Sequence, residues 1–117
     1  MIGLKLQYIT KPILTNEDYR EFLKYLNTLA DDKYRRSNEK LVPGREKILG
    51  VRVPVMRRLA KEIAYLGGEE YLRIPKGDIQ EEIVLHGLVI GCLKLSFEDM
   101  RDQIREYAKM VDNWANC

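Results

Sequence analysis

Apolar residues recur along most of this chain at intervals of three and four, the spacing of amphipathic helices. Thr15 or Asn16 can cap a first helix, and Glu17 and Asp18 place negative charge at its positive end. The apolar positions that follow are Tyr19, Phe22, Leu23, Leu26 and Ala30. The pattern predicts one helix from about residue 16 and a shorter one over residues 31–41.

The middle of the chain predicts three more helices. Pro54 suits the first turn of a helix, where a missing N–H costs nothing, and Gly67 and Gly68 end it. A short helix over about residues 69–74 follows, and a longer one covers about residues 78–95. The last of these contains a β-branched run that also suits a buried strand, but the pattern on both sides favours a helix. The predicted buried stripe of the Pro54 helix is Val55, Met56, Leu59, Ala60 and Ile63.

The strongest helical signal lies near the C-terminus. Ser96 begins the run SFED, which resembles a capping box. The stripe that follows consists of Phe97, Met100, Ile104, Tyr107, Ala108, Val111 and Trp114.

These elements predict an all-α fold of antiparallel helical pairs. Each amphipathic pair must stack on a neighbour to bury its apolar face, so an α-solenoid of HEAT-like repeats is the natural architecture. The last stripe ends at Trp114 with no further helix to cover it. We therefore expect the solenoid to be truncated on its C-terminal side, and we expect this exposed helix edge to drive self-association.

Composition describes one soluble globular domain. The chain has 117 residues, of which 45% are hydrophobic and 32% charged. It shows no signal-peptide pattern and no apolar run of the roughly 20 residues that a membrane helix needs. Two cysteines, Cys92 and Cys117, do not make a disulfide framework. We expect a cytoplasmic protein.

The charge is unevenly distributed. The chain has 20 Lys and Arg against 18 Asp and Glu, but residues 33–61 hold ten basic residues against two acidic ones. This stretch carries +8, so the rest of the chain carries −6. On the Pro54 helix, Arg57, Arg58 and Lys61 are predicted to point into solvent together, opposite the apolar stripe. A phosphate backbone is one partner for such a face, and the alternative is a solvated face paired with acids elsewhere.

Few residues suggest chemistry. His86, the only histidine, lies in an apolar run and is interpreted as a packing residue; no metal or cofactor site is expected. Gly87 and Gly91 would allow another helix to approach, and Cys92 is interpreted as a small core residue. The pair Glu81 and Glu82 is explained by the positive end of a helix dipole.

Four segments resemble a known family. In order and spacing, DDKYRRSNEKLVP, ILGVRVPVMRRLAKEIA, EEIVLHGLVIGCLK and VDNWANC resemble the N-terminal half of the DNA alkylation repair family, the AlkD-like DNA glycosylases. The resemblance covers about residues 31–117. It implies a HEAT-like repeat domain over residues 15–117, preceded by an extension over residues 1–14, in a family about twice as long as this chain.

The resemblance also implies an activity. Members of this family remove purines alkylated at N3 or N7 from double-stranded DNA by hydrolysing the N-glycosidic bond. The alkylated base is already cationic and leaves readily. A carboxylate stabilises the developing sugar cation, and tryptophan faces attract the cationic base.

Carried over by residue, Trp114 matches an aromatic active-site position, and Tyr34 matches a tyrosine near the DNA. Phosphate contacts are implied for Arg52, Arg57 and Arg58, to which Lys61 is added. The family's catalytic aspartate would come directly after Cys117. Asp112 lies on the preceding turn and points elsewhere, so it is a poor substitute. We therefore expect no glycosylase activity from these 117 residues.

Two other interpretations remain open. The chain could be a non-catalytic helical-repeat module that binds the DNA backbone or a protein partner. It could also be a truncated gene product without function.

Overall fold

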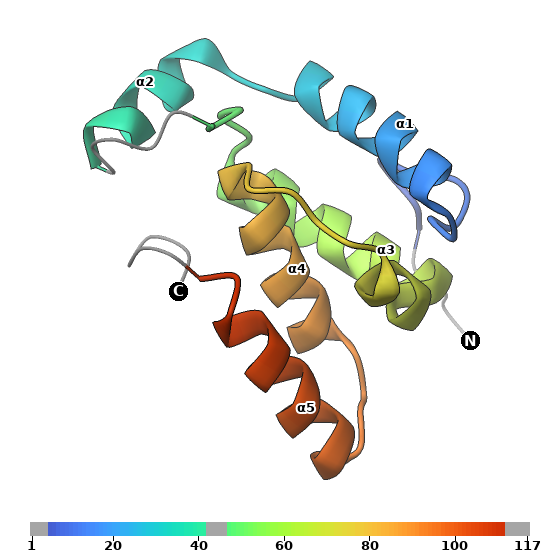
Figure 1. The fold of residues 1–117 in the computed structure, drawn as a ribbon. Helices are drawn as coiled ribbons and strands as arrows, with labels where there is room; N and C mark the ends of the chain where they lie inside the picture. Colours follow the sequence, from blue (N-terminus) through green and yellow to red (C-terminus); the bar gives the residue numbers. More distant parts are fainter. Residues whose placement is uncertain (1–4, 42–46, 112–117) are drawn as a thin grey trace.

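The computed structural model describes residues 5–41 and 47–111 (Figure 1). Within these two ranges the chain is entirely helical, with no strand. The helices are α1 (Asn16–Thr28), α2 (Asp32–Leu41), α3 (Val53–Arg73), α4 (Gln80–Cys92) and α5 (Phe97–Ala108). The all-α class predicted from the sequence is confirmed.

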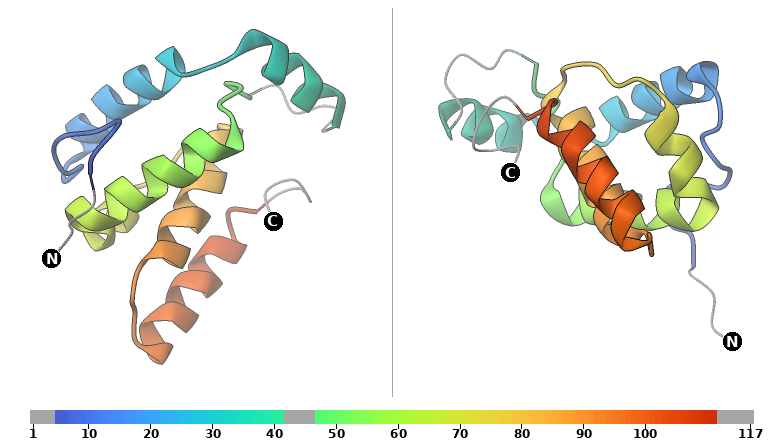
Figure 2. Two further views of the ribbon diagram at one scale, coloured as in Figure 1. Left: turned by 180° about the vertical axis from the view of Figure 1, so that it is seen from behind. Right: turned by 60° about the horizontal axis from the view of Figure 1, so that its bottom comes forward.

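The helices are arranged around a central pair, α3 and α4. Helix α1 lies on one side of this pair and α5 on the other, where α5 runs antiparallel to α4 (Figures 1 and 2). Side chains from α1, α3 and α4 fill the core, which also includes Ile9 and Ile13 from the segment before α1. The boundary expected at residue 14 stays a prediction, but the described part of that segment packs in the same core. The largest fully buried hydrophobic side chains are those of Tyr71, Leu26, Met56, Leu59, Ile63, Leu85 and Val89.

The helix starts follow the capping signals in the sequence. The Thr15 hydroxyl accepts a hydrogen bond from the backbone N–H of Asp18 at 3.0 Å, and the Asp18 carboxylate accepts in return from that of Thr15 at 3.2 Å. At the start of α5, the Ser96 hydroxyl accepts from the N–H of Asp99 at 3.1 Å. These bonds satisfy donors that a helix cannot pair internally.

Helix α3 has two limbs. Met56, Leu59, Ala60 and Ile63 are buried as predicted, and Val55 is half-buried. At Gly67 the backbone adopts a φ of +137°, a region that favours glycine, and the helix kinks there. The break predicted at this glycine is therefore confirmed, and the expected short helix over residues 69–74 is the second limb of α3.

Three buried glutamates hold segments that lack regular structure. Glu62, in α3, is fully buried and accepts hydrogen bonds from the backbone N–H groups of Gln7 (2.9 Å), Tyr8 (2.8 Å) and Ile9 (3.0 Å). Burial pushes the pKa of the Glu62 carboxyl up, but these N–H groups and Arg58 outweigh it, and the net pKa lies below its usual value. The hydrogen bonds of the Glu62 carboxylate thus attach the segment before α1 to α3.

The other two buried glutamates, Glu81 and Glu82, lie in the first turn of α4. Glu81 accepts from the backbone N–H groups at positions 49 and 50, each at 2.9 Å, and from that of Val51 at 3.2 Å. Glu82 accepts from Gly77 N–H at 2.9 Å, and from the Tyr19 hydroxyl at 2.7 Å. The helix dipole is therefore an incomplete explanation of this pair, because both side chains are buried and bind distant parts of the chain.

His86 is a core histidine, as predicted. It is 5% exposed, and its ring stacks on that of Tyr107 with centroids 6.1 Å apart. Burial lowers its pKa to about 4, and the nearby Lys76 charge acts in the same direction. The Lys76 ammonium itself lies 4.2 Å from the centre of the Tyr71 ring, and burial lowers its pKa to about 8.

Three expectations for α4 need correction. The helix covers residues 80–92 instead of 78–95, because Ile79 and Leu93 have extended backbones. Cys92 is exposed, so it is not a core residue. A Cβ atom on Gly87 would lie 2.6 Å from the Tyr107 ring, which confirms a close approach, but no atom of the described residues lies within 4 Å of the same position on Gly91.

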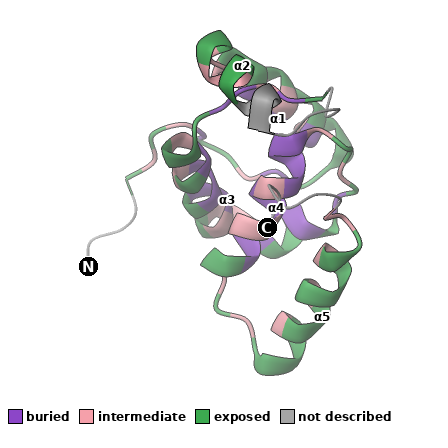
Figure 3. Ribbon diagram, turned by 90° about the vertical axis from the view of Figure 1, so that its left-hand side faces the viewer, coloured by how far each residue is buried: buried purple, intermediate pink, exposed green. Residues whose placement is uncertain are grey.

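Helix α5 forms an edge of the molecule (Figure 3). None of its residues is buried, and Phe97 and Ile104 are 82% and 54% exposed. Met100 and Tyr107 of the same predicted stripe pack against the core. The helices described here are all too short or too polar to cross a membrane.

The first prediction concerns Glu81. Replacing its carboxylate in Glu81→Gln leaves buried N–H groups poorly paired, so we expect the free energy of unfolding to fall by about 2 kcal/mol. Chemical denaturation measures this change. The exposed Glu69→Gln is the control and should stay within about 0.5 kcal/mol of the parent protein. Equal stability of the two variants would contradict a structural role for Glu81.

The second prediction concerns pH. His86 is neutral in the folded protein, whereas in the unfolded chain it binds a proton below its ordinary pKa of 6.5. Its contribution to stability is therefore present above pH 6.5 and is lost as the pH falls toward 4. We expect a loss of roughly 2 to 3 kcal/mol between pH 7 and 4.5.

Denaturation curves across this range measure the loss, and His86→Leu should flatten it. Glu62 affects the pH dependence of stability only below about its ordinary pKa of 4.5. Its effect therefore falls in a lower pH range than that of His86. An unchanged pH slope in His86→Leu would show that another group is responsible.

Candidate nucleic-acid interface

Among the described residues of the basic stretch 33–61, the structure distinguishes paired from unpaired cations. Ion pairs join Lys47 to Asp78 at 2.9 Å and Arg52 to Asp31 at 3.1 Å. Arg35 lies 3.5 Å from Asp32. These pairs neutralise part of the local positive charge. The alternative of a solvated face paired with acids thus describes some of these residues.

Arg58 belongs to the interior network. Its guanidinium donates to the buried Glu62 carboxylate at 2.8 Å and also bonds to the backbone carbonyl of Lys5. Its side chain is 29% exposed. The expectation that Arg58 points into solvent beside Arg57 and Lys61 is therefore wrong. The physical reason is that the buried Glu62 charge requires a cation, and Arg58 lies one turn away.

Arg57 and Lys61 lie on the exposed side of α3 and make no ion pair with any residue that the structure describes. They are four residues apart, so they point to the same side of the helix. Tyr65, one turn further on, is 58% exposed. We call Arg57, Lys61 and Tyr65 the α3 ridge. Tyr65 was missed by the sequence reasoning, although its spacing of four from Lys61 could have indicated it.

Arg52 and Tyr34, two residues expected near DNA, are in contact. The Arg52 guanidinium lies 5.1 Å from the centre of the Tyr34 ring. Asp31 links them, because its carboxylate accepts from the backbone N–H of Tyr34 at 3.0 Å and from Arg52. These two partners, in that order, lower the pKa of the Asp31 carboxyl. The contact joins the start of α2 to the start of α3.

Cys92 does not add a nucleophile to this surface. Although the residue as a whole is exposed, partial desolvation of its thiol raises the thiol pKa, and the Lys61 charge only partly opposes this. The thiol is therefore protonated at neutral pH and weakly reactive.

The expected chemical residues Trp114 and Asp112 lie outside the described residues, so their roles stay predictions. Across residues 5–41 and 47–111, no group of three or more His, Cys, Asp or Glu side chains could hold a metal ion.

The sequence matches no family model, and no curated protein or solved structure matches it either.

Proposed function

We propose that this chain is the N-terminal section of a HEAT-like helical-repeat DNA glycosylase of the DNA alkylation repair type, whose described helices bind the backbone of duplex DNA. Two features support the proposal. One is the set of four sequence segments that resemble this family. The other is the α3 ridge, where Arg57 and Lys61 present positive charge to solvent with no ion-pair partner among the described residues.

The ridge suits phosphate recognition for an electrostatic reason. A cation that already has a carboxylate partner must give it up to bind a phosphate, whereas Arg57 and Lys61 have no partner to lose within the described residues. Each phosphate that they neutralise releases condensed counterions, which supplies most of the binding free energy at low salt. Tyr65 adds an exposed hydroxyl and ring beside them.

We assign an aromatic contact with the alkylated base to Trp114 and assign the catalytic carboxylate to none of the three buried glutamates. The three buried glutamates are already occupied, because Glu62, Glu81 and Glu82 each accept several hydrogen bonds from the chain itself. None of them is available to stabilise a sugar cation. The carboxylate required by the reaction must therefore be a group other than these three.

Because the three buried glutamates are engaged in hydrogen bonds within the chain, a second candidate is also supported. This candidate is a non-catalytic helical-repeat module that binds DNA. These 117 residues alone are expected to release no base under either candidate. Release of 7-methylguanine from methylated duplex DNA, assayed with a chain extended through the next helices of the expected repeat, separates the two candidates. Salt-dependent binding accompanied by release supports the glycosylase, and binding without release supports the module.

The third prediction tests the α3 ridge. The double variant Arg57→Ala with Lys61→Ala should weaken binding to duplex DNA. It should also reduce the slope of log affinity against log salt concentration by roughly 2, since each lost phosphate contact contributes about 0.9. Fluorescence anisotropy over a salt series measures both quantities.

The matched control is Arg20→Ala with Lys24→Ala, which removes the same charge from exposed positions of α1 with the same spacing. Equal losses in the two double variants would contradict a specific role for the ridge. Arg58→Ala is unsuitable for this test because it leaves the buried Glu62 without its cation, and folding would be affected.

We also propose that α5 mediates self-association of the isolated chain through Phe97 and Ile104. Its first turn is acidic, with Glu98 and Asp99, and its last turn carries Arg105. An antiparallel copy of α5 would place the acidic turn of one helix beside Arg105 of the other. The two exposed apolar side chains would then be covered by a two-fold symmetric contact.

The fourth prediction follows from this contact. Sedimentation velocity should show a dimer that becomes more abundant as the protein concentration rises, and Phe97→Ser with Ile104→Ser should return the protein to a monomer. Leu14→Ser with Val53→Ser removes two exposed apolar side chains elsewhere and should leave the dimer intact. A parent protein that stays monomeric at all concentrations would refute the contact.

A further inference from the structure

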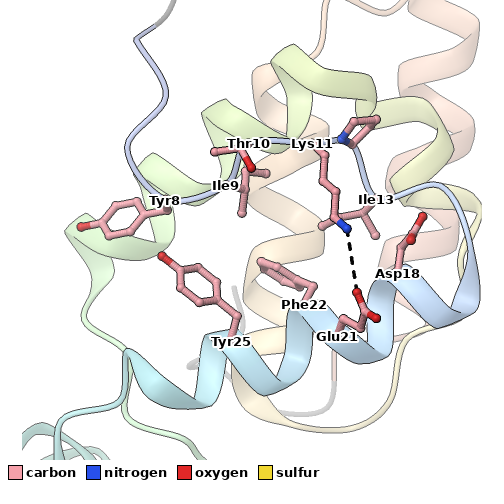
Figure 4. A pocket seen from close by; sticks show the side chains of 10 residues that line it. Tyr8, Ile9, Thr10, Lys11, Ile13, Asp18, Glu21, Phe22 and Tyr25 are labelled. Carbon is pink, nitrogen blue, oxygen red and sulfur yellow. Dashed lines mark ion pairs between the residues drawn. The ribbon is translucent and has the colours of Figure 1, made fainter.

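A cleft of about 230 Å³ opens between the segment before α1 and α1 itself (Figure 4). Aromatic side chains enter it from both walls. Tyr8 comes from the segment, and Phe22 and Tyr25 come from α1. One lysine, Lys11, and two carboxylates, those of Asp18 and Glu21, complete the charged part of the lining. The formal charge of the cleft is therefore −1.

The wall formed by the segment is fixed in place without a ligand. The backbone N–H groups of Tyr8 and Ile9 donate to the buried Glu62 carboxylate, and the side chains of Ile9 and Ile13 are buried in the core. Collapse of the cleft would require breaking hydrogen bonds to a buried charge, which is costly. The cleft is thus preformed.

The aromatic rings differ in what they contact. Phe22 is buried and packs against Tyr19 and Tyr71, with ring centroids 6.2 and 6.4 Å away. Tyr8 and Tyr25 are half-buried, and neither ring contacts another ring among the described residues. Their hydroxyls also have no hydrogen-bond partner there. Two ring faces and two hydroxyls are therefore available to a ligand in the cleft.

A cation of the chain itself already lies in this cleft. Lys11 Nζ is 4.0 Å from Glu21 Oε2, and the two side chains are 74% and 60% exposed. An ion pair this long and this exposed contributes little stability. Asp18 is engaged at the start of α1, where it accepts from the backbone N–H groups of Leu14 and Thr15. Glu21 is therefore the carboxylate that an external cation can reach by displacing Lys11.

We propose that this cleft binds a small organic cation, a quaternary ammonium group of trimethylammonium size, between the rings of Tyr8 and Tyr25 with Glu21 as its counter-charge. Aromatic faces attract such cations by about 0.5 to 2 kcal/mol each, and a quaternary ammonium is more easily desolvated than a primary one. The volume suits a small ligand better than a drug-sized one, which needs roughly 300 Å³ or more. The negative lining disfavours an anion. This inference does not depend on the DNA-binding proposal.

Choline is the probe, and its neutral carbon isostere 3,3-dimethylbutan-1-ol is the matched ligand without charge. Two-dimensional ¹H–¹⁵N NMR of the labelled protein follows the backbone amides during titration. We expect saturable shifts confined to residues 8–13 and 18–25 with a Kd of about 1 mM, which corresponds to about −4 kcal/mol. The isostere should bind at least about tenfold more weakly, because it lacks the cation–π and ionic terms.

Variants separate the two recognition elements. Tyr25→Leu removes a ring and Glu21→Gln removes the counter-charge, so each should weaken choline binding by about three- to tenfold. Lys11→Gln removes the competing cation and should tighten binding by about two- to threefold. Glu17→Gln, an exposed carboxylate on the same helix, is the control and should leave the affinity unchanged.

The amide spectrum of each variant verifies that the fold is intact. Equal affinity for choline and its isostere would overturn the proposal in favour of a purely apolar cleft. It would equally be overturned by shifts that stay linear with choline concentration, or by Lys11→Gln weakening the binding.

Discussion

The constraint on which this structure depends is the pairing of three buried carboxylates with backbone N–H groups. A charge out of water is tolerated only where hydrogen bonds replace its hydration, and irregular segments can be buried only where their N–H groups find acceptors. Glu62 and Glu81 meet both requirements at once, because each binds three consecutive N–H groups of a segment without regular structure. Glu82 links the turn before α4 to Tyr19 of α1. The segment before α1 and the segments before α3 and α4 are thereby fixed to the central α3–α4 pair.

The same constraint determines which basic side chains of α3 are paired and which point into solvent. Arg58 and Arg57 are neighbours on one helix, yet Arg58 compensates the buried Glu62, whereas Arg57 points into solvent with Lys61. Helix α3 therefore has an apolar face in the core, an ionic edge that holds the segment before α1, and an exposed basic ridge. The DNA-binding proposal uses only the ridge. The cleft that we propose binds a cation depends on Glu62, because the hydrogen bonds of Glu62 fix the wall that carries Tyr8.

Features of this fold that depend on residues close in sequence could be predicted. Features that depend on residues far apart in sequence could not. The helix starts at Thr15 and Ser96 and the break at Gly67 depend on residues within a few positions of each other, and all three predictions are confirmed. The exposure of Cys92 and the open space beside Gly91 depend on where other helices pass. For the candidate site, the sequence indicated the basic stretch, and the contact of Arg52 with Tyr34 joined two of its expected residues. Which cations are free required the positions of acids such as Asp31 and Asp78.

By itself, the sequence determined that this protein is built from amphipathic helices, since apolar spacing is a property of neighbouring residues and needs no partner. The tertiary structure alone decided the role of each charge. Glu81 and Glu82 occupy positions where a helix dipole would favour any acid, yet their hydrogen bonds reach as far as Val51 and Tyr19. A charged side chain acts according to what surrounds it when the chain is folded, and those surroundings come from residues 30 and 63 positions away.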